Sequence, residues 1–398
     1  MKAGKRKKTV KTGTLVGIDP IMPIIILLLL IFGSVMVFSA SFPYAQKAHG
    51  DGYYYVKRQI FWAVLGLLGM SVCAYLPPLF HKKYTAKFGF MAAAVCLVLV
   101  LFSGSSVKRW LEIGFFRFQP SELMKPMLIL VLAAYMEKAQ PYIRKNGISG
   151  HGLLGTRITS GKLFRRASLY GTFIPIGIVA AVCGLIMLEN HFSGTLITFA
   201  IGAAVIFSGG AMIRWFAGAG AVAVGAVCAV LFGTDYASER VDIWLHPENF
   251  SVRDETWQIT QGLIAIGSGG IFGRGLGNGL QKQLYVSAPH NDFIFSIVCE
   301  ELGLIGAVLV IALFLAFVIR GFGIASKAGT LFASLTAVGI SFHVGIQAFL
   351  NIGVVSGTIP NTGVTLPFFS YGGSALVVLL CEAGILLSVS KREVENNE

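Results

Sequence analysis

Two charged side chains of opposite sign lie three residues apart at the start of an apolar stretch. Glu122 and Lys125 are spaced i, i+3, so a helix presents both on one face. Ionisable residues in or beside an apolar span are functional candidates, because burying a charge there is costly. The alternative is an internal ion pair that only holds the helix in place, and the spacing alone leaves both interpretations open.

Three further polar residues precede this pair, namely Arg109, Arg117 and Gln119. Together with Glu122 and Lys125 they would form a cationic, hydrogen-bonding mouth suited to an anionic head group. The guanidinium group of Arg binds phosphate oxygens in pairs, which suits a pyrophosphate. We therefore predict that these five residues bind substrate.

A single carboxylate, Asp292, lies where a polar segment enters an apolar run. Partial burial raises the pKa of a carboxyl group unless a cation or a metal holds it ionised. This environment suits a general base, and the same carboxylate can hold a divalent cation such as Mg²⁺ or Mn²⁺. The alternative is that Asn291 or Asp292 only caps the following helix.

The remaining polar groups in apolar runs favour packing roles. One of Glu300 and Glu301 must face the interior, and His343 and Gln347 share a helix face at i, i+4 as an interhelical hydrogen-bonding pair. The histidines lack partners at metal-ligand spacing, so no zinc site is predicted. No nucleotide-binding or hydrolase motif occurs, and no organic cofactor is predicted.

The elements that must position these side chains are long apolar runs. Of the 398 residues 55% are hydrophobic and 13% are charged, whereas soluble domains carry about 25% charged residues. A helix that crosses a bilayer needs roughly 20 apolar residues. The fold class predicted is therefore an all-α polytopic membrane protein, a bundle of ten transmembrane helices. The spans are expected near 21–40, 59–76, 88–104, 121–137, 171–188, 193–209, 214–233, 291–319, 331–355 and 372–390.

The basic residues predict the orientation of this bundle. An even number of spans places both termini on one side, and that side holds 21 Lys and Arg residues against ten on the other. The positive-inside rule then makes both termini cytoplasmic. The net charge of +13 would also suit nucleic acid, but no base-reading fold accompanies it, so no nucleic-acid partner is predicted.

The spans divide the chain into a basic cytoplasmic tail (1–19), a transmembrane domain (20–391) and a short cytoplasmic tail (392–398). A large extracytoplasmic loop, 234–290, separates the seventh and eighth spans, and loops of this length are usually functional. Its glycine cluster, 267–279, fits either a phosphate-facing backbone nest or a closely packed re-entrant loop.

Four long motifs in this order resemble the SEDS family (shape, elongation, division and sporulation), whose members include FtsW, RodA and SpoVE. They are YYYVKRQIFWAVLG (53–66), KRWLEIGFFRFQPSELMKP (108–126), the segment 264–306 around PHNDFIFSIVCEELG, and NIGVVSGTIPNTGVTLPFFSYGGSAL (351–376). The last motif looks most like the division and sporulation branch. One departure is ENHFSGT (189–195), where the family often has Pro-Asp and where Glu189 is the nearby substitute.

The resemblance implies a ten-helix enzyme of the bacterial plasma membrane that polymerises lipid II, an undecaprenyl-pyrophosphate-linked substrate, outside the membrane. The family's essential acid falls on Asp292, and its other cavity positions fall on Arg109, Arg117, Gln119, Glu122 and Lys125. The implied partner is a bitopic class B penicillin-binding transpeptidase. The alternatives are a lipid II flippase and a non-catalytic scaffold of the division machinery. Polar groups gathered on the outer side favour the polymerase over the flippase.

Overall fold

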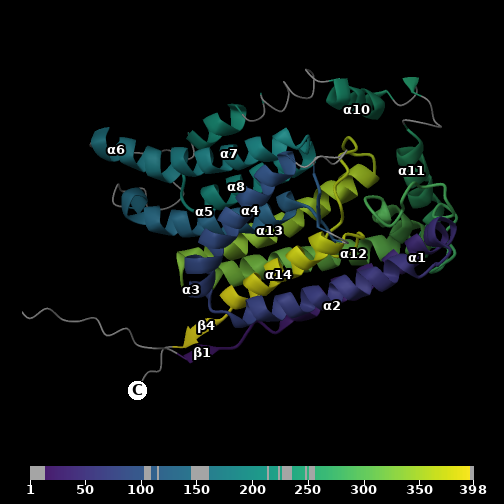
Figure 1. Cartoon of the computed structure of the whole chain (residues 1–398), viewed down its shortest axis with the longest axis horizontal. Coiled ribbons are helices and arrows are strands. Elements are labelled where there is room, and N and C mark those ends of the chain that lie inside the picture. Colours follow the sequence, from purple (N-terminus) through teal and green to yellow (C-terminus); the bar gives the residue numbers. More distant parts are fainter. Residues whose placement is uncertain are drawn as a thin grey trace, which may run out of the picture.

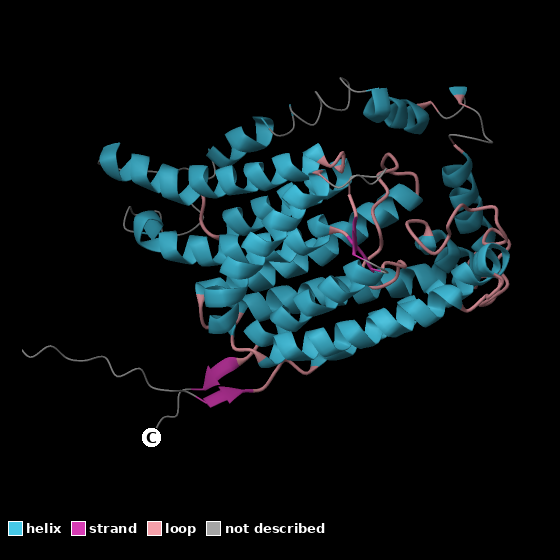
Figure 2. Ribbon diagram, viewed as in Figure 1, coloured by secondary structure: helices cyan, strands magenta, loops and turns pink. Residues whose placement is uncertain are grey.

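The computed structural model describes residues 14–102, 109–113, 116–144, 161–212, 215–222, 225, 235–246, 249–250 and 256–394. Helices dominate this part of the chain and run side by side in one elongated bundle (Figure 2). In chain order they are α1 (Ile21–His49), α2 (Tyr54–Tyr75), α3 (Pro78–Phe80), the π-helix η1 (His81–Gly89), α4 (Phe90–Leu101), α5 (Pro120–Arg144), α6 (Gly161–Ser168), the π-helix η2 (Leu169–Phe173), α7 (Ile174–Leu188), α8 (Phe192–Ser208), α10 (Asp235–Leu245), α11 (Trp257–Gly269), α12 (Ile294–Ser326), α13 (Leu331–Val355) and α14 (Gly373–Val389).

Two antiparallel strand pairs complete the described chain. β2 (Leu111–Ile113) pairs with β3 (Phe116–Phe118), and β1 (Thr14–Val16) pairs with β4 (Arg392–Val394). The second pair brings the two ends of the chain together at one end of the bundle, whereas α10 and α11 lie at the other end (Figure 1). β1 and β4 belong to the segments predicted as tails, of which 1–13 and 395–398 lie outside the described residues.

Asp19 anchors the end of the bundle that carries the strand pair. Its Oδ1 accepts hydrogen bonds from the N–H groups of Ile21 (3.1 Å) and Met22 (3.0 Å) and so caps the start of α1. Arg320 of α12 donates two hydrogen bonds to the same carboxylate, and the Asp19 N–H donates to Ser390 Oγ after α14 (3.1 Å). Three helices that are distant in the sequence therefore meet at one side chain.

The centre of the bundle is α13, which packs against α5, α8, α12 and α14. It is the most buried of the long apolar helices. Its start is capped by Thr330, whose Oγ1 accepts from the Ala333 N–H (3.2 Å). His343, Gln347 and Asn351 follow at four-residue spacing, so they lie along one face of this central helix.

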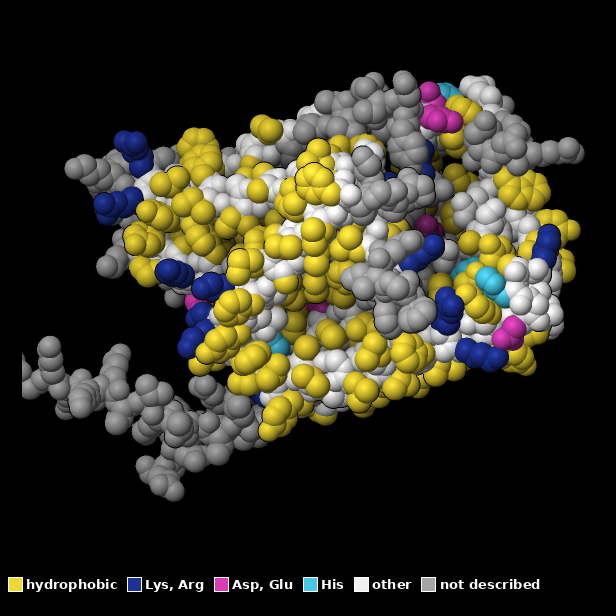
Figure 3. All heavy atoms as spheres, in the orientation of Figure 1, with side chains coloured by type: hydrophobic (Ala, Val, Ile, Leu, Met, Phe, Trp, Pro, Cys, Tyr) yellow, Lys and Arg dark blue, Asp and Glu magenta, His cyan; other side chains and the backbone are white. Residues whose placement is uncertain are grey.

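The outer surface of the bundle is apolar. Six described helices are long and apolar enough to cross a membrane, and side chains such as Leu68 and Ile319 are more than 60% exposed. Figure 3 shows hydrophobic side chains over the middle of the face in view and Lys and Arg side chains toward its two ends. A surface of this kind suits contact with lipid, because apolar groups exposed to water would be unfavourable.

The helices occur where the sequence predicts spans, but several of them begin or end at other residues than predicted. Nine of the ten predicted spans coincide with described helical segments, and the seventh, 214–233, lies largely outside the described residues. α1 continues from position 40 to His49, and α12 covers Ile294–Ser326 where 291–319 was predicted. The apolar run predicts only the part of a helix that faces lipid. The helix itself continues until a residue ends its backbone hydrogen bonding, as Gly50 does for α1 in the left-handed conformation (φ 70°).

The glycine-rich segment 267–279 packs closely against α12. The Gly277 N–H donates to Glu301 Oε2 (3.0 Å), and the Leu280 N–H donates to Glu300 Oε1 (2.7 Å). At Gly273 (φ 79°) a Cβ would lie 2.2 Å from the Glu301 carbonyl oxygen, so only glycine fits there. The prediction of a closely packed loop is confirmed. These amides face buried carboxylates, so the phosphate-facing nest is wrong for them.

Both Glu300 and Glu301 are fully buried, although the sequence required only one of them to face the interior. Glu301 forms an ion pair with Lys282 (2.7 Å) and accepts a hydrogen bond from Ser39 Oγ of α1. The prediction that they are polar packing residues is confirmed, because they join the glycine-rich segment and Lys282 to the bundle.

Glu301→Gln should destabilise the fold by about 3–5 kcal/mol, because Lys282 would keep its charge in a buried site without its partner. The free energy of unfolding in detergent micelles measures this. Lys57→Gln is the matched control: it breaks the exposed Lys57–Asp51 pair (2.8 Å) and should cost less than about 1 kcal/mol. Equal effects of the two substitutions would contradict the anchoring role of the buried pair.

Candidate active site

Asp292 lies in the turn that leads into α12. The N-cap residue of this helix is Phe293, and no side chain among the described residues caps it, so the capping interpretation is wrong. No described residue donates a hydrogen bond to the Asp292 carboxylate, and Oδ2 lies 3.4 Å from where a Cβ on Gly363 would be. Burial raises the pKa of this carboxyl, and the charge of Arg240 in α10 partly offsets the rise. Such a group is suited to accept a proton or hold a cation.

Asn351 of α13 fixes the backbone around this carboxylate. Its Nδ2 donates to the carbonyl oxygens of Asp292 and Val364, both at 2.7 Å. Ser370 Oγ also donates to the Asn291 carbonyl oxygen at 2.9 Å. The central helix and the loop before α14 therefore determine where Asp292 lies.

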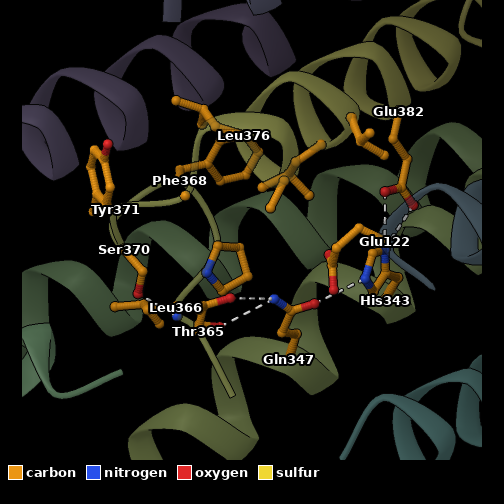
Figure 4. Close-up of a pocket in the computed structure, with 15 residues that line it drawn as sticks. Glu122, His343, Gln347, Thr365, Leu366, Phe368, Ser370, Tyr371, Leu376 and Glu382 are labelled. Atoms are coloured by element: carbon orange, nitrogen blue, oxygen red, sulfur yellow. Dashed lines mark hydrogen bonds and ion pairs between the residues drawn. The ribbon is translucent and has the colours of Figure 1, made fainter. Parts of the chain in front are cut away.

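Glu122 and Lys125 form the ion pair that their spacing predicts. Lys125 Nζ lies 2.8 Å from Glu122 Oε2, and only 2% of the Lys125 side chain is exposed. The same ammonium group donates to Gln347 Oε1 of α13 at 3.1 Å. Glu122 and Gln347 line a pocket that the loop before α14 closes (Figure 4). Its water-accessible space of about 30 Å³ holds roughly one or two water molecules.

The β2–β3 hairpin delivers the predicted arginines to the start of α5. Arg109 donates to the backbone carbonyls of Glu189 (3.3 Å) and Asn190 in the turn between α7 and α8. Arg117 lies on β3 and is exposed. The hairpin therefore brings one cation against the neighbouring turn and presents the other outward.

Gln119 reaches the same turn through His191. Gln119 Nε2 lies 3.4 Å from His191 Nδ1, and Ser121 Oγ lies 3.3 Å from it. Burial lowers the pKa of His191 to about 4, so this ring is neutral at pH 7. The charges of Glu122 and Lys125 also act on His191, which places the turn beside the ion pair.

Glu189 is the acid nearest to the position where the sequence departs from the family pattern. Its carboxylate is buried, and neither oxygen has a hydrogen-bond partner among the described residues. Burial raises the pKa of Glu189 to about 8, against the charge of Arg109. The Glu189 carboxyl group is therefore neutral at pH 7. Arg109 donates to the backbone carbonyl of Glu189 and not to its side chain.

A short stretch of the loop before α14 connects the two halves of the site. Gly363 lies beside the Asp292 carboxylate, and two residues later the Thr365 carbonyl accepts from Gln347 Nε2 at 3.1 Å. Gln347 in turn holds Lys125. Asp292 therefore lies beside this loop segment, and Lys125 is connected to it through Gln347.

Comparison with known proteins places this chain in a family. Residues 20–395 match the profile of the cell cycle proteins FtsW, RodA and SpoVE. The chain belongs to this family. Membership, together with the apolar helices, makes it a multi-pass membrane protein.

Two relatives from this FtsW, RodA and SpoVE family show how far the similarity extends. A probable peptidoglycan glycosyltransferase FtsW of Geobacter sp. (strain M18) is 35% identical, with coverage of 94% of this chain and 97% of the relative. Stage V sporulation protein E of Bacillus subtilis (strain 168) is 36% identical, with the same coverage of both chains. These relatives agree with the division and sporulation branch predicted from the last motif.

A chain in a solved structure shares the fold. It comes from a peptidoglycan synthase complex described as coordinating polymerization and crosslinking. Its TM-score is 0.73 at 25% identity, and the match covers 94% of this chain and 98% of the other.

The structure adds site residues that the sequence did not indicate. Arg240 of α10 donates to the Asn361 carbonyl at 2.7 Å and acts electrostatically on Asp292. His191 and Asn351 also organise the site without having been predicted. All three are recognised by contacts between segments that lie far apart in the chain. The spacing of residues within one segment carries no information about such contacts.

The described residues contain no group of three or more His, Cys, Asp or Glu side chains placed to hold a metal ion. Asp292 alone still fits a weaker kind of site. Mg²⁺ commonly binds one or two carboxylates and takes its other ligands from water and substrate phosphates. The donor-free Asp292 carboxylate fits this pattern, whereas a closed zinc-type site is not formed by the described chain.

Proposed function

We propose that this chain is a peptidoglycan glycosyltransferase that polymerises lipid II into glycan strands at the outer face of the bacterial plasma membrane. The observation that carries the proposal is a single loop that lies beside Asp292, whose carboxylate has no hydrogen-bond donor among the described residues, and that binds Gln347, which holds the buried ammonium group of Lys125. The relation to FtsW along nearly the whole chain supports it. Purified protein incubated with lipid II should form glycan polymer.

The reaction proposed is transfer of a glycosyl group between two lipid-linked sugars. The 4-hydroxyl of the incoming lipid II attacks the anomeric carbon of the lipid-linked strand, and the bond to polyprenyl pyrophosphate breaks. Asp292 takes the proton from the hydroxyl group, as a general base does. The lipid pyrophosphate leaves with the bonding electrons, so its developing charge needs cations nearby.

The cationic groups are assigned to the pyrophosphate. Lys125 supplies a buried ammonium group, which Glu122 orients. Arg109, just before the β2–β3 hairpin, and Arg117, on β3, add two guanidinium groups, and Gln119 adds an amide donor. The alternative role of Asp292 is that of a metal ligand: it would hold a divalent cation, Mg²⁺ or Mn²⁺, which would neutralise phosphate charge when bound.

The topology proposed has ten spans, both termini cytoplasmic and the loop 234–290 outside. The basic-residue asymmetry supports this orientation. The β1–β4 pair, which holds both chain ends together, supports a shared side for the termini.

Cysteines introduced in place of two exposed serines at opposite ends of α12 test the orientation. Ser287→Cys, before the helix, should react with a membrane-impermeant thiol reagent in intact cells, and Ser326→Cys, at its end, should not. Both are made in a background without native cysteines, and permeabilised cells provide the labelling control. Labelling of Ser326→Cys alone in intact cells would reverse the proposed topology.

The partner proposed is a class B penicillin-binding transpeptidase, which would crosslink the strands that this chain makes. The chain of the same fold in a solved peptidoglycan synthase complex supports this assignment. Co-purification of the two membrane proteins from mild detergent tests it.

A further inference from the structure

A chain of hydrogen bonds extends from the Lys125 ammonium group across α13 to α14; Figure 4 shows its part from Gln347 through His343 to Glu382. Lys125 Nζ donates to Gln347 Oε1 at 3.1 Å, and His343 Nε2 lies 3.0 Å from the same oxygen. His343 Nδ1 lies 2.9 Å from Glu382 Oε1 of α14. The reaction proposed above uses neither His343 nor Glu382, although both are buried.

The direction of each hydrogen bond follows from groups that can act in only one way. The Thr365 carbonyl can only accept, so Gln347 must turn its NH₂ group toward it (3.1 Å) and its Oε1 toward Lys125. Because that Oε1 can only accept, His343 must carry a hydrogen on Nε2. With a hydrogen on Nε2, the contact of Nδ1 with Glu382 is made in one of two ways: a doubly protonated ring donates to the carboxylate, or a protonated Glu382 donates to Nδ1.

This arrangement determines where the Lys125 ammonium group points. An ammonium group has three N–H donors on a flexible stem. Glu122 takes one donor and Gln347 takes the second, and the third has no acceptor among the described residues. A lysine bound to Glu122 alone would be free to rotate about the ion pair, whereas two fixed acceptors aim the third donor.

We propose that Gln347, His343 and Glu382 are positioning residues that hold Lys125 so that its remaining N–H donates to the pyrophosphate of the lipid substrate. The inference rests on the proposed role of Lys125 in binding and explains which residues orient its ammonium group for that role. The three residues act through Lys125 and do not themselves touch the substrate.

Affinity for farnesyl diphosphate, a detergent-soluble polyprenyl diphosphate, measures this role. Glu382→Leu and His343→Phe should each weaken binding about fivefold, the effect of losing one buried hydrogen bond. Glu382→Gln should recover most of the loss, because its amide can donate to His343 Nδ1 and so keep the hydrogen on Nε2. A purely space-filling role for Glu382 would make the Gln and Leu variants equivalent.

Ser341→Ala is the matched control on α13. Ser341 is buried two residues before His343 but donates only within its own helix, to the Ala337 carbonyl (2.7 Å). Its loss should leave the affinity for farnesyl diphosphate unchanged. Thermal unfolding and gel filtration of every variant show that folded protein is compared.

A double-mutant cycle that combines His343→Phe with Lys125→Met tests whether His343 acts through Lys125. If His343 acts through Lys125, then His343→Phe has no further effect on affinity in the Lys125→Met background. Equal fold-losses in both backgrounds would overturn the positioning role while leaving the proposed function intact. Unchanged affinity of Lys125→Met itself would instead refute the proposed role of Lys125 in binding.

Discussion

Asp292→Asn should reduce polymerisation of lipid II to near background. The substitution keeps the size and polarity of the side chain but removes its ability to accept a proton, and a general base contributes roughly 10²–10⁴-fold to a rate. Because the Asp292 side chain caps nothing in the structure, its loss should leave the helix start intact. The measurement is glycan polymer formed by purified protein, together with its melting temperature.

Asp242→Asn is the matched control for this substitution. Asp242 is an exposed carboxylate on α10, in the large loop 234–290 that precedes Asp292, so the same chemical change should leave polymer yield unchanged. A folded Asp292→Asn protein with near-normal yield would end the assignment of Asp292 to the reaction. If Asp292 holds a divalent cation, the residual activity of the variant should require a higher concentration of Mg²⁺ or Mn²⁺.

Lys125→Met should weaken binding of the lipid pyrophosphate about 10- to 100-fold, the range expected for losing a hydrogen bond to a charged group. Met keeps much of the length of the lysine stem, so packing changes little while the charge is lost. KM for lipid II and affinity for farnesyl diphosphate should change together. Glu122→Gln should have a smaller effect in the same direction, because Lys125 keeps its charge and its contact with Gln347.

Lys282→Met separates binding from stability in this experiment. Lys282 is another buried lysine in an ion pair, but its partners are Glu301 and Ser39. It anchors the glycine-rich loop and is not one of the residues proposed to bind substrate. Its loss should lower the melting temperature and leave affinity per folded molecule unchanged. If Lys125→Met behaves in the same way, the Glu122–Lys125 pair is structural.

Much of the fold could be predicted from the sequence because the lipid environment leaves a local signal. A run of apolar residues long enough to cross a bilayer identifies a helix without knowledge of its neighbours. The i, i+3 spacing of Glu122 and Lys125 likewise predicted a contact that lies within one helix. Helix ends were less well predicted, because α1 continues past its apolar stretch to Gly50.

The site could be predicted only where its contacts are local in the sequence. Gln347 lies 222 residues from Lys125, and Arg240 lies 121 residues from Asn361. Such pairs depend on which helices become neighbours, and the spacing of residues along one chain does not contain that information. The same reason explains why His343 and Gln347 were recognised as a hydrogen-bonding pair but not connected to Lys125.

The measurement that tests the central claim most directly is polymerisation by the purified protein. Wild-type protein in detergent or proteoliposomes is incubated with lipid II, with and without the transpeptidase partner, and the products are separated by length. The account predicts glycan strands that need this chain, are lost in Asp292→Asn and become crosslinked only when an active transpeptidase is present. Transfer of lipid II across the vesicle membrane without any polymer, under conditions where the protein is folded, would contradict it.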